Sequence, residues 1–377
     1  MPLHFEHSAP LTLGAELEFQ LLNRETLDLS SSSLQVLELL VGDNAIKAEI
    51  YQSMIEIMTG VCANAHEIGN ELRAAMFKLF KACNTLNLSV ASAGTHPFAT
   101  YEDGIVFPEA RYRKLLENHQ WIAKRLLIFG LHIHVGMRNG EHAIQVANAL
   151  LHYLPLFLAL SSSSPFCNSE DTQLSSSRTT FFEAIPTGGH PCTFEDWSEF
   201  QYTYARLLQS GSIDCPKDLW WDIRPSPGFG TIEIRICDSP ATICETEAII
   251  SLVHLLCQKI DHEISSGQTL RPPPFWLLRE NKWRAMRKGI RAEIIFAEDG
   301  STRTIKEFLE GILNDLIPFI EANKYNAQMD LLKKIVAKGS SADRQRLLYQ
   351  QSNCNFLCVL NSLIDELQTD IPNWYLT

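Results

Sequence analysis

Three short segments of the chain each place two polar residues, two positions apart, inside an apolar pattern typical of a β-strand. The pairs are Glu16 and Glu18 in LGAELEF, His132 and His134 in GLHIHVG, and Glu233 and Arg235 in TIEIRIC. Side chains in a strand alternate between the two faces of a sheet, so each pair shares one face and its apolar neighbour takes the other. Carboxylates, imidazoles and a guanidinium on one concave surface are suited to binding divalent cations and an anionic substrate. The pattern therefore predicts a polar, catalytic cavity.

Each pair alone also fits a simpler interpretation. The two glutamates could lie on a solvent-facing strand edge. The two histidines could be core histidines or the H-x-H ligands of a metal hydrolase, and Glu233 and Arg235 could form a same-face salt bridge. Their joint occurrence favours the cavity, because carboxylates forced together repel and take up protons unless a cation compensates them. We therefore expect bound divalent metal.

Two further glutamates and two arginines are candidates for the same site. Glu49 and Glu56 are seven residues apart, which in an uninterrupted strand would place them on opposite faces. Both can serve one site only if a bulge or a strand break separates them. Arg178 and Arg224 lie in predicted loops, where each is either a surface cation or a fork for a carboxylate or phosphate.

The common sequence motifs that bind a nucleotide or activate a serine are absent. The chain has no G-x-x-x-x-G-K-[ST], no G-x-G-x-x-G after a predicted strand and no G-x-S-x-G. A bound nucleotide would therefore have to be held by metal ions and strand residues.

The apolar periodicity alternates between strand and helix in the first two thirds of the chain and becomes mostly helical from Cys244 onward. Besides the strands that carry the His and Glu–Arg pairs, we predict strands at 11–22, 47–58 and 89–93, and helices at 65–86, 109–129 and 143–160. The mixture indicates an α+β protein with an antiparallel sheet and helices packed on it. The polar segment 161–178, which contains two serine clusters, is predicted to be a long loop of the kind that commonly carries function.

Length and composition limit the class of protein. The 377 residues fit one large domain or a catalytic domain with a helical extension. A net charge of −12, with no basic stripe, argues against a nucleic-acid-binding surface. The N-terminus lacks the regions of a secretory signal, and the apolar runs 150–160 and 249–257 are too short to span a bilayer. Ten cysteines without a C-x-x-C pair are expected to be reduced thiols. We therefore predict a cytoplasmic protein with neither membrane nor nucleic-acid partners.

Taken in order along the chain, the motifs resemble those of the type 2 glutamate–cysteine ligase family, also called carboxylate–amine ligases, which is related to glutamine synthetase. The resemblance rests on 14–19 (GAELEF), Glu49, Gln52 and Glu56, 94–97 (GTHP), 130–136 (GLHIHVG), 163–166 (SSPF), 221–226 (WDIRPS) and 230–235 (GTIEIR), and extends to 281–285 (NKWRA). One departure is Leu17, where compared members usually carry a further glutamate. The pair of Glu16 and Glu18 is unaffected by it.

The resemblance implies a glutamine-synthetase-like catalytic fold in a single domain, 1–377, with a sheet-forming core at about 10–243 and a mostly helical part at 244–377. It implies a ligase that uses ATP and two or three Mg²⁺ or Mn²⁺ ions and forms an amide through an acyl phosphate. The implied metal ligands are Glu16, His132 and Glu233 for one ion, and Glu18 and Glu56 for another, with Glu49 nearby. The residues implied to face phosphate are His134 and Arg235. The candidates for gripping the acid substrate or the nucleotide are Arg178 and Arg224, and a homodimer is plausible by the resemblance alone.

Three hypotheses of function are open at this point. The first is the ligase, with glutamate as the acid and cysteine as the amine. The second is a metal-dependent hydrolase that uses the H-x-H pair, and the third is a catalytically silent member that binds only metal or nucleotide. Phosphate release from ATP that requires an added amine would separate the first hypothesis from the other two.

Overall fold

The centre of the protein is a seven-stranded sheet. The computed structural model describes residues 3–371, and the strands run in the order β10-β11-β5-β1-β3-β2, with β4 also paired to β1. The strands are β1 (Leu13–Asn23), β2 (Ile46–Ala48), β3 (Met54–Met58), β4 (Leu88–Ala91), β5 (Gly130–Gly136), β10 (Ile223–Ser226) and β11 (Thr231–Asp238). Every pairing between these strands is antiparallel, which confirms the predicted sheet.

One face of the sheet is covered by helices. The helices that pack here are α2 (Ala65–Thr85), α4 (Gly140–Leu150), α5 (Leu154–Ser161) and α8 (Ile243–Ser265). The strand residues Leu17, Ile133 and Ile234 are fully buried in the same hydrophobic core as these helices. Burial of each such side chain contributes roughly 1.5–3 kcal/mol. The polar residues that alternate with them therefore point to the opposite face.

Local sequence explains where α2 begins and which face it buries. The Asn64 side chain accepts a hydrogen bond from the backbone N–H of Glu67 and so caps the first turn. Along the helix, Ile68, Leu72 and Met76 are buried at four-residue spacing, which aligns them on the side that meets the sheet. The structure thus confirms the helix predicted for this segment.

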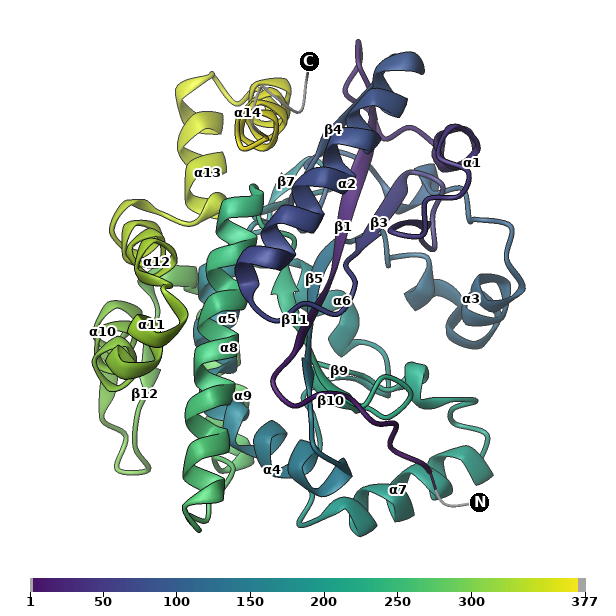
Figure 1. The fold of residues 1–377 in the computed structure, drawn as a ribbon. Coiled ribbons are helices and arrows are strands. Elements are labelled where there is room, and N and C mark those ends of the chain that lie inside the picture. Colours follow the sequence, from purple (N-terminus) through teal and green to yellow (C-terminus); the bar gives the residue numbers. More distant parts are fainter. Residues whose placement is uncertain (1–2, 372–377) are drawn as a thin grey trace.

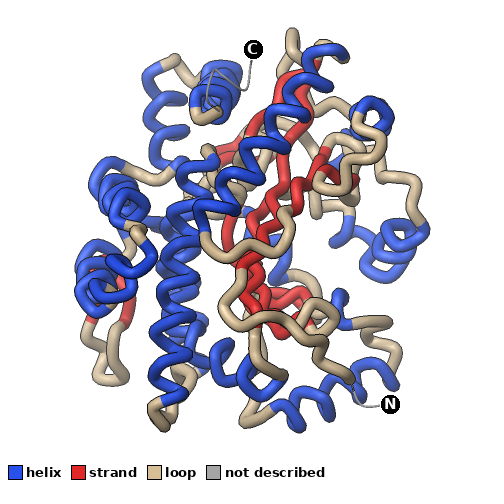
Figure 2. The backbone as a smooth tube through the Cα atoms, viewed as in Figure 1, coloured by secondary structure: helices blue, strands red, loops and turns tan. Residues whose placement is uncertain are grey.

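The remaining elements surround the sheet and its helical layer. The other helices are α1 (Ser33–Leu39), α3 (Ala110–Ala123), α6 (Arg178–Glu183), α7 (Trp197–Gln209), α9 (Phe275–Lys288), α10 (Ile305–Asp315), α11 (Ile317–Asn323), α12 (Asn326–Lys338), α13 (Ser341–Gln351) and α14 (Phe356–Thr369). The short 3₁₀ helices are η1 (Tyr101–Asp103), η2 (Leu151–Tyr153), η3 (Pro216–Asp218) and η4 (Gly289–Arg291). Short strand pairs are formed by β6 (Phe166–Cys167) with β7 (Glu170–Asp171), β8 (Gly188–Gly189) with β9 (Trp220–Trp221), and β12 (Glu293–Ile295) with β13 (Thr302–Thr304). Figures 1 and 2 show that α10–α12 lie beside α8, on the side away from α3, and that α13 and α14 lie above them, where α14 packs against β4.

The segment 47–58 departs from the single strand that its pattern predicts. It is split between β2 and β3, which pair with each other so that Lys47 lies opposite Glu56. The chain turns between them because Ile50 and Tyr51 are buried in a separate apolar cluster that also contains residues of α3. The prediction of one continuous strand is therefore wrong, and the break that a shared site requires is present.

Two predicted helices also differ from the structure. The helix expected at 143–160 is interrupted by η2 just before Pro155, whose ring and missing N–H oppose a continuous helix. The helix expected at 109–129 ends at Ala123, and the chain then approaches β5 without helical structure.

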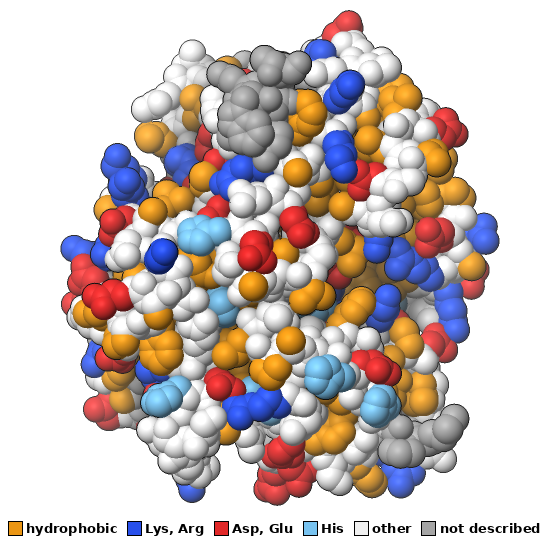
Figure 3. Space-filling view, viewed as in Figure 1, with side chains coloured by type: hydrophobic (Ala, Val, Ile, Leu, Met, Phe, Trp, Pro, Cys, Tyr) orange, Lys and Arg blue, Asp and Glu red, His pale blue; other side chains and the backbone are white. Residues whose placement is uncertain are grey.

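In the described part of the chain, one helical stretch is long and apolar enough to cross a membrane. It covers Gly140–Ser161, and 78% of its most apolar window is buried inside the protein. This burial is typical of a core helix in a soluble protein. On the face shown in Figure 3, acidic and basic side chains are interspersed.

A buried histidine in α8 should make the stability of the fold depend on pH. His254 Nδ1 lies 3.0 Å from Tyr325 Oη, and its Nε2 lies 3.0 Å from Gln258 Nε2. Burial lowers the pKa of His254 from 6.5 to about 4, so the unfolded chain takes up a proton more readily than the folded one between these values. Stability is therefore lost as the pH falls from 6.5 towards 4. We expect this group to remove about 2 kcal/mol from the free energy of unfolding between pH 7 and pH 5.

Urea denaturation of the wild type and of His254→Gln at both pH values checks this expectation. The variant should lose about 2 kcal/mol less than the wild type on acidification. Equal losses in the two proteins would contradict the assignment.

Candidate active site

Strand register brings the predicted polar residues together on one face of the sheet. The directly opposed pairs are Glu16 and His132 on β1 and β5, Glu18 and Glu56 on β1 and β3, and Glu233 and His134 on β11 and β5. Directly opposed residues share a face and have Cβ atoms about 4.5–5.5 Å apart. Side chains that are distant in the sequence thus become neighbours on the face opposite the helical layer.

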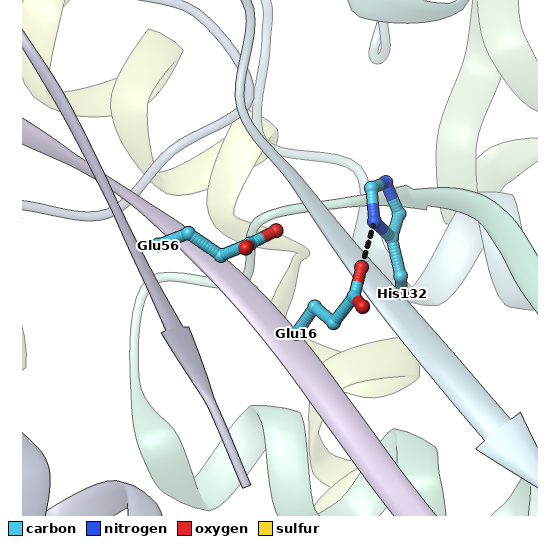
Figure 4. Close-up of side chains that lie close together, drawn as sticks. All are labelled: Glu16, Glu56 and His132. Atoms are coloured by element: carbon cyan, nitrogen blue, oxygen red, sulfur yellow. Dashed lines mark hydrogen bonds and ion pairs between the residues drawn. The ribbon is translucent and has the colours of Figure 1, made fainter. Parts of the chain in front are cut away.

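Glu16 lies at the centre of this polar face. Its Oε2 is 3.1 Å from His132 Nδ1, and its Oε1 is 3.5 Å from His134 Nε2. Figure 4 shows the side chain of Glu56 extending from the neighbouring strand towards Glu16 and His132. Burial alone would raise the pKa of Glu16, but hydrogen bonds and charge from the two histidines outweigh it and hold that pKa below its usual range. Glu16 therefore carries a negative charge at neutral pH.

The Nε2 atoms of both histidines are buried and free for a ligand. Within residues 3–371 neither makes a hydrogen bond, although His134 Nε2 has the carboxylate of Glu16 beside it at 3.5 Å. Their Nδ1 atoms are engaged, since His132 Nδ1 faces Glu16 and His134 Nδ1 lies 2.9 Å from Thr231 Oγ1. Burial, followed by the charge of Arg235, lowers the pKa of His132 to about 4. A neutral ring held through one nitrogen with the other free is the arrangement that metal-binding histidines adopt.

Three glutamates from different segments form an acidic group at one end of the polar face. Glu18 comes from β1, Glu56 from β3, and Glu49 from the turn that follows β2. Glu18 Oε2 accepts a hydrogen bond from Gly130 N–H at 2.6 Å, and Glu49 Oε2 accepts one from Ile50 N–H at 2.7 Å. Burial, and then the charge of Glu49, raise the pKa of Glu18 to about 8 and that of Glu56 well above its usual value. These carboxylates would give up their protons if a cation lay between them.

Glu233 lies at the other end of the polar face, between two arginines. Arg224 Nε donates to Glu233 Oε2 at 2.9 Å, Arg224 Nη2 donates to Oε1 at 3.2 Å, and Arg235 also donates to Oε1. Burial would raise the pKa of Glu233, but the charges of Arg224 and Arg235 outweigh it and keep the carboxylate ionised. Arg224 lies on β10 rather than in a loop, so that part of the sequence prediction is wrong.

Arg178 lies on the polar side of the sheet, against β5 and β11. It is the first residue of α6 and is only 1% exposed. Its Nη1 and Nη2 donate to the carbonyl of Arg235 at 3.3 and 3.4 Å, and its guanidinium lies over the ring of Phe182. Gly130 makes room for it, since a Cβ there would lie 2.1 Å from Arg178 Nη2. The helical position of Arg178 corrects the predicted loop, while a role of Arg178 or Arg224 in gripping substrate stays a prediction.

Among residues 3–371, three groups of side chains could each hold a metal ion, because their ligand atoms lie within 4.8 Å of one another. The groups are Glu16, Glu56 and His132; Glu16, His134 and Glu233; and Glu18, Glu49 and Glu56. Oxygen-rich groups with one imidazole suit Mg²⁺ or Mn²⁺. The family resemblance implies His132 as the histidine that shares a metal ion with Glu16 and Glu233. In the structure, the histidine grouped with these two glutamates is His134. The assignment of ions to individual residues stays a prediction.

Asp238, a fully buried carboxylate at the end of β11, is not among the residues predicted from the sequence. It accepts hydrogen bonds from Ser163 N–H at 3.0 Å, from Ser164 Oγ at 2.7 Å and from Ser176 Oγ at 2.8 Å. Burial raises the pKa of Asp238. The two serine clusters of the segment 161–178 thus converge on one acceptor. In the sequence, the only sign of this carboxylate was that two clusters of serine hydroxyls need a hydrogen-bond acceptor.

Two solved structures share this fold. Glutamate–cysteine ligase from Francisella tularensis, in complex with AMP, matches with a TM-score of 0.67 at 12% identity, over 97% of this chain and 94% of that one. A bifunctional glutathione synthetase from Pasteurella multocida matches with a TM-score of 0.67 at 11% identity, over 96% of this chain and 52% of that one. The protein therefore has the α+β fold of the glutamate–cysteine ligase class, as predicted.

Sequence similarity then defines the family. The profile of glutamate-cysteine ligase family 2 matches residues 12–358. A relative from Bdellovibrio bacteriovorus named "Putative glutamate–cysteine ligase 2" is 39% identical over 371 residues, which cover 98% of each chain. A relative of the same name from Thermobifida fusca is 37% identical over 378 residues, covering 99% of this chain and 94% of its own. The chain belongs to glutamate-cysteine ligase family 2, and it is a carboxylate–amine ligase of that kind.

Replacing a glutamate shared between two ligand groups should affect metal binding more than replacing an unshared one. Glu16 belongs to two of the groups and Glu49 to one. We expect Glu16→Gln to lower the affinity for two Mn²⁺ ions about 10-fold or more. Glu49→Gln should lower the affinity for one ion. Isothermal titration with Mn²⁺ measures both the affinity and the number of ions.

The matched control is Glu280→Gln, which alters a carboxylate that pairs with Arg284 on α9. Wild-type binding in both site variants, or an equal loss in the control, would show that the metal lies elsewhere.

Proposed function

We propose that the protein joins glutamate to cysteine in an ATP-dependent reaction that forms γ-glutamylcysteine. The observation that carries this proposal is the convergence of glutamates, two histidines and Arg235 on one buried polar face. Membership of glutamate-cysteine ligase family 2 supports the class of reaction. The AMP in the Francisella tularensis ligase supports the use of a nucleotide.

The chemistry requires activation of the acid, because a carboxylate is a poor electrophile. Transfer of the γ-phosphoryl group of ATP to the γ-carboxylate of glutamate forms an acyl phosphate and releases ADP. The amine of cysteine then attacks the acyl carbon and loses a proton. The C–O bond to phosphate breaks, and phosphate leaves as the amide forms.

Arg235 is placed to stabilise the charge that develops in both steps. Its guanidinium is paired with Glu233, and its Nη1 lies 3.5 Å from His132 Nδ1. A fixed cation at this position would neutralise the transferred phosphoryl group and the later tetrahedral oxyanion. His134, held through Nδ1 by Thr231, would direct its Nε2 to the same phosphate oxygens.

The donor groups on the polar face fit two or three Mg²⁺ or Mn²⁺ ions. Glu16, His132 and Glu233 would hold an ion at one end, and Glu18, Glu49 and Glu56 would hold an ion at the other, while His134 faces phosphate. Such ions, when bound, neutralise and orient phosphate oxygens. The buried His132 Nε2, which makes no hydrogen bond, and the raised pKa values of Glu18 and Glu56 support this fit.

We also propose that the protein works in the cytoplasm, which is a reducing compartment. All ten cysteines are free, including Cys62, Cys83 and Cys257 in the core. Unpaired thiols are typical of proteins that work where glutathione and thioredoxin keep cysteine reduced.

Phosphate release tests the proposed function directly. The purified protein is given Mg²⁺-ATP and glutamate with a panel of amines that includes cysteine, and phosphate and the ligated mass are measured. We expect release only when ATP, acid and amine are all present, with the mass of γ-glutamylcysteine. Metal-dependent hydrolysis without ATP would support a hydrolase instead, and silence across the panel would count against glutamate and cysteine as the pair.

Removal of a central carboxylate should abolish most turnover without unfolding the protein. Glu16→Ala or Glu233→Ala is expected to reduce kcat on the order of 100-fold or more, the scale for loss of a key electrostatic group. Circular dichroism and thermal melting would verify folding. A folded variant with a near-wild-type rate would contradict the site.

A further inference from the structure

Lys282 on α9 is a buried cation that the proposed reaction does not use. Its side chain is 1% exposed, and its Nζ lies 2.7 Å from Asp222 Oδ2 and 2.8 Å from Glu183 Oε1. Asp222 is itself only 5% exposed. Burying a lysine and an aspartate is costly unless the charges are paired, so this contact fixes the positions of both side chains.

The first connection from Lys282 to the polar face runs through Asp222. Asp222 precedes β10, and its carbonyl accepts the backbone N–H of Arg235 at 2.8 Å. This bond continues the β10–β11 ladder, in which Arg224 lies opposite Glu233 and Ile223 opposite Ile234. The position of Asp222 therefore determines where the backbone of Arg235 enters the site.

The second connection runs through Glu183, the last residue of α6. The first residue of the same helix, Arg178, donates from Nη1 and Nη2 to the carbonyl of Arg235 at 3.3 and 3.4 Å. The N–H and the C=O of Arg235 are thus bonded to residues of two different segments. Lys282 joins the side chains of both segments through a single ammonium group.

We propose that Lys282 is a positioning residue for Arg235. It holds the start of β10 and the end of α6 together, and these two segments hold the backbone of Arg235 in register with Glu233. Lys282 has no access to substrate and acts only through the groups it binds. Its place in the NKWRA segment, which the catalytic residues leave unexplained, is accounted for by this role. The inference rests on the proposed function of Arg235.

The test compares Lys282→Met, which removes the charge at similar size, with Lys282→Arg, which keeps it. The control is Arg73→Met, because Arg73 is a partly buried cation that pairs with Glu247 in the helical layer. We expect Lys282→Met to lower kcat on the order of 10- to 100-fold with KM values for ATP and the acid changed less than about twofold. Lys282→Arg should restore most of kcat, and Arg73→Met should lower Tm while leaving kcat within about twofold of wild type.

A fall in kcat that merely follows Tm in all variants, or an unchanged kcat in Lys282→Met, would overturn the proposal. If Lys282→Met does not fold, the double variant Lys282→Met with Asp222→Asn removes both charges and is measured in its place. A crystal structure of the folded variant gives a readout independent of turnover. Displacement of the Arg235 guanidinium from Glu233 supports the proposal, and an unmoved Arg235 overturns it. A wild type without turnover would refute the proposed function alone.

Discussion

Repulsion between buried carboxylates on one face of an antiparallel sheet is the constraint on which the rest of the structure depends. At one end, Glu16 and Glu233 keep their charge because histidines and arginines lie against them. At the other end, burial and mutual repulsion raise the pKa of Glu18 and Glu56. The face is therefore charged where it is paired with protein cations and short of positive charge elsewhere. Divalent cations would supply that missing charge.

The elements behind and beside the face keep these charges in register. Helices on the opposite side bury the alternating apolar residues of the same strands, so a strand cannot shift by one residue without exposing its core side chains. Arg178 holds the end of β11 by donating to its backbone carbonyl at Arg235. Asp238 holds the same end by accepting hydrogen bonds from the two serine clusters. Lys282 adds a link between α6, α9 and the start of β10. Together they limit the conformations open to Arg235.

The polar face could be predicted from the sequence because strand alternation is local. Three consecutive residues suffice to assign both members of the pair that begins with Glu16, or of the pair that begins with His132, to the same face. The partner of each residue could not be predicted, because register depends on pairing between segments that are distant in the sequence, such as Glu16 and His132, which are 116 residues apart. Glu49 reached the site through a turn caused by burial of neighbouring residues. Lys282 lies in a helix rich in charged residues, and only tertiary packing distinguishes it from an exposed lysine.

The proposed reaction requires that the glutamate-rich face bind divalent metal next to a nucleotide phosphate. The most direct test is a crystal structure with Mn²⁺ and a non-hydrolysable ATP analogue, in which anomalous scattering locates each ion. The account predicts peaks within ligand distance of Glu16 and Glu233 and of the group formed by Glu18, Glu49 and Glu56, with phosphate oxygens near Arg235. Peaks at other positions, or bound nucleotide with no ion at these glutamates, would contradict it.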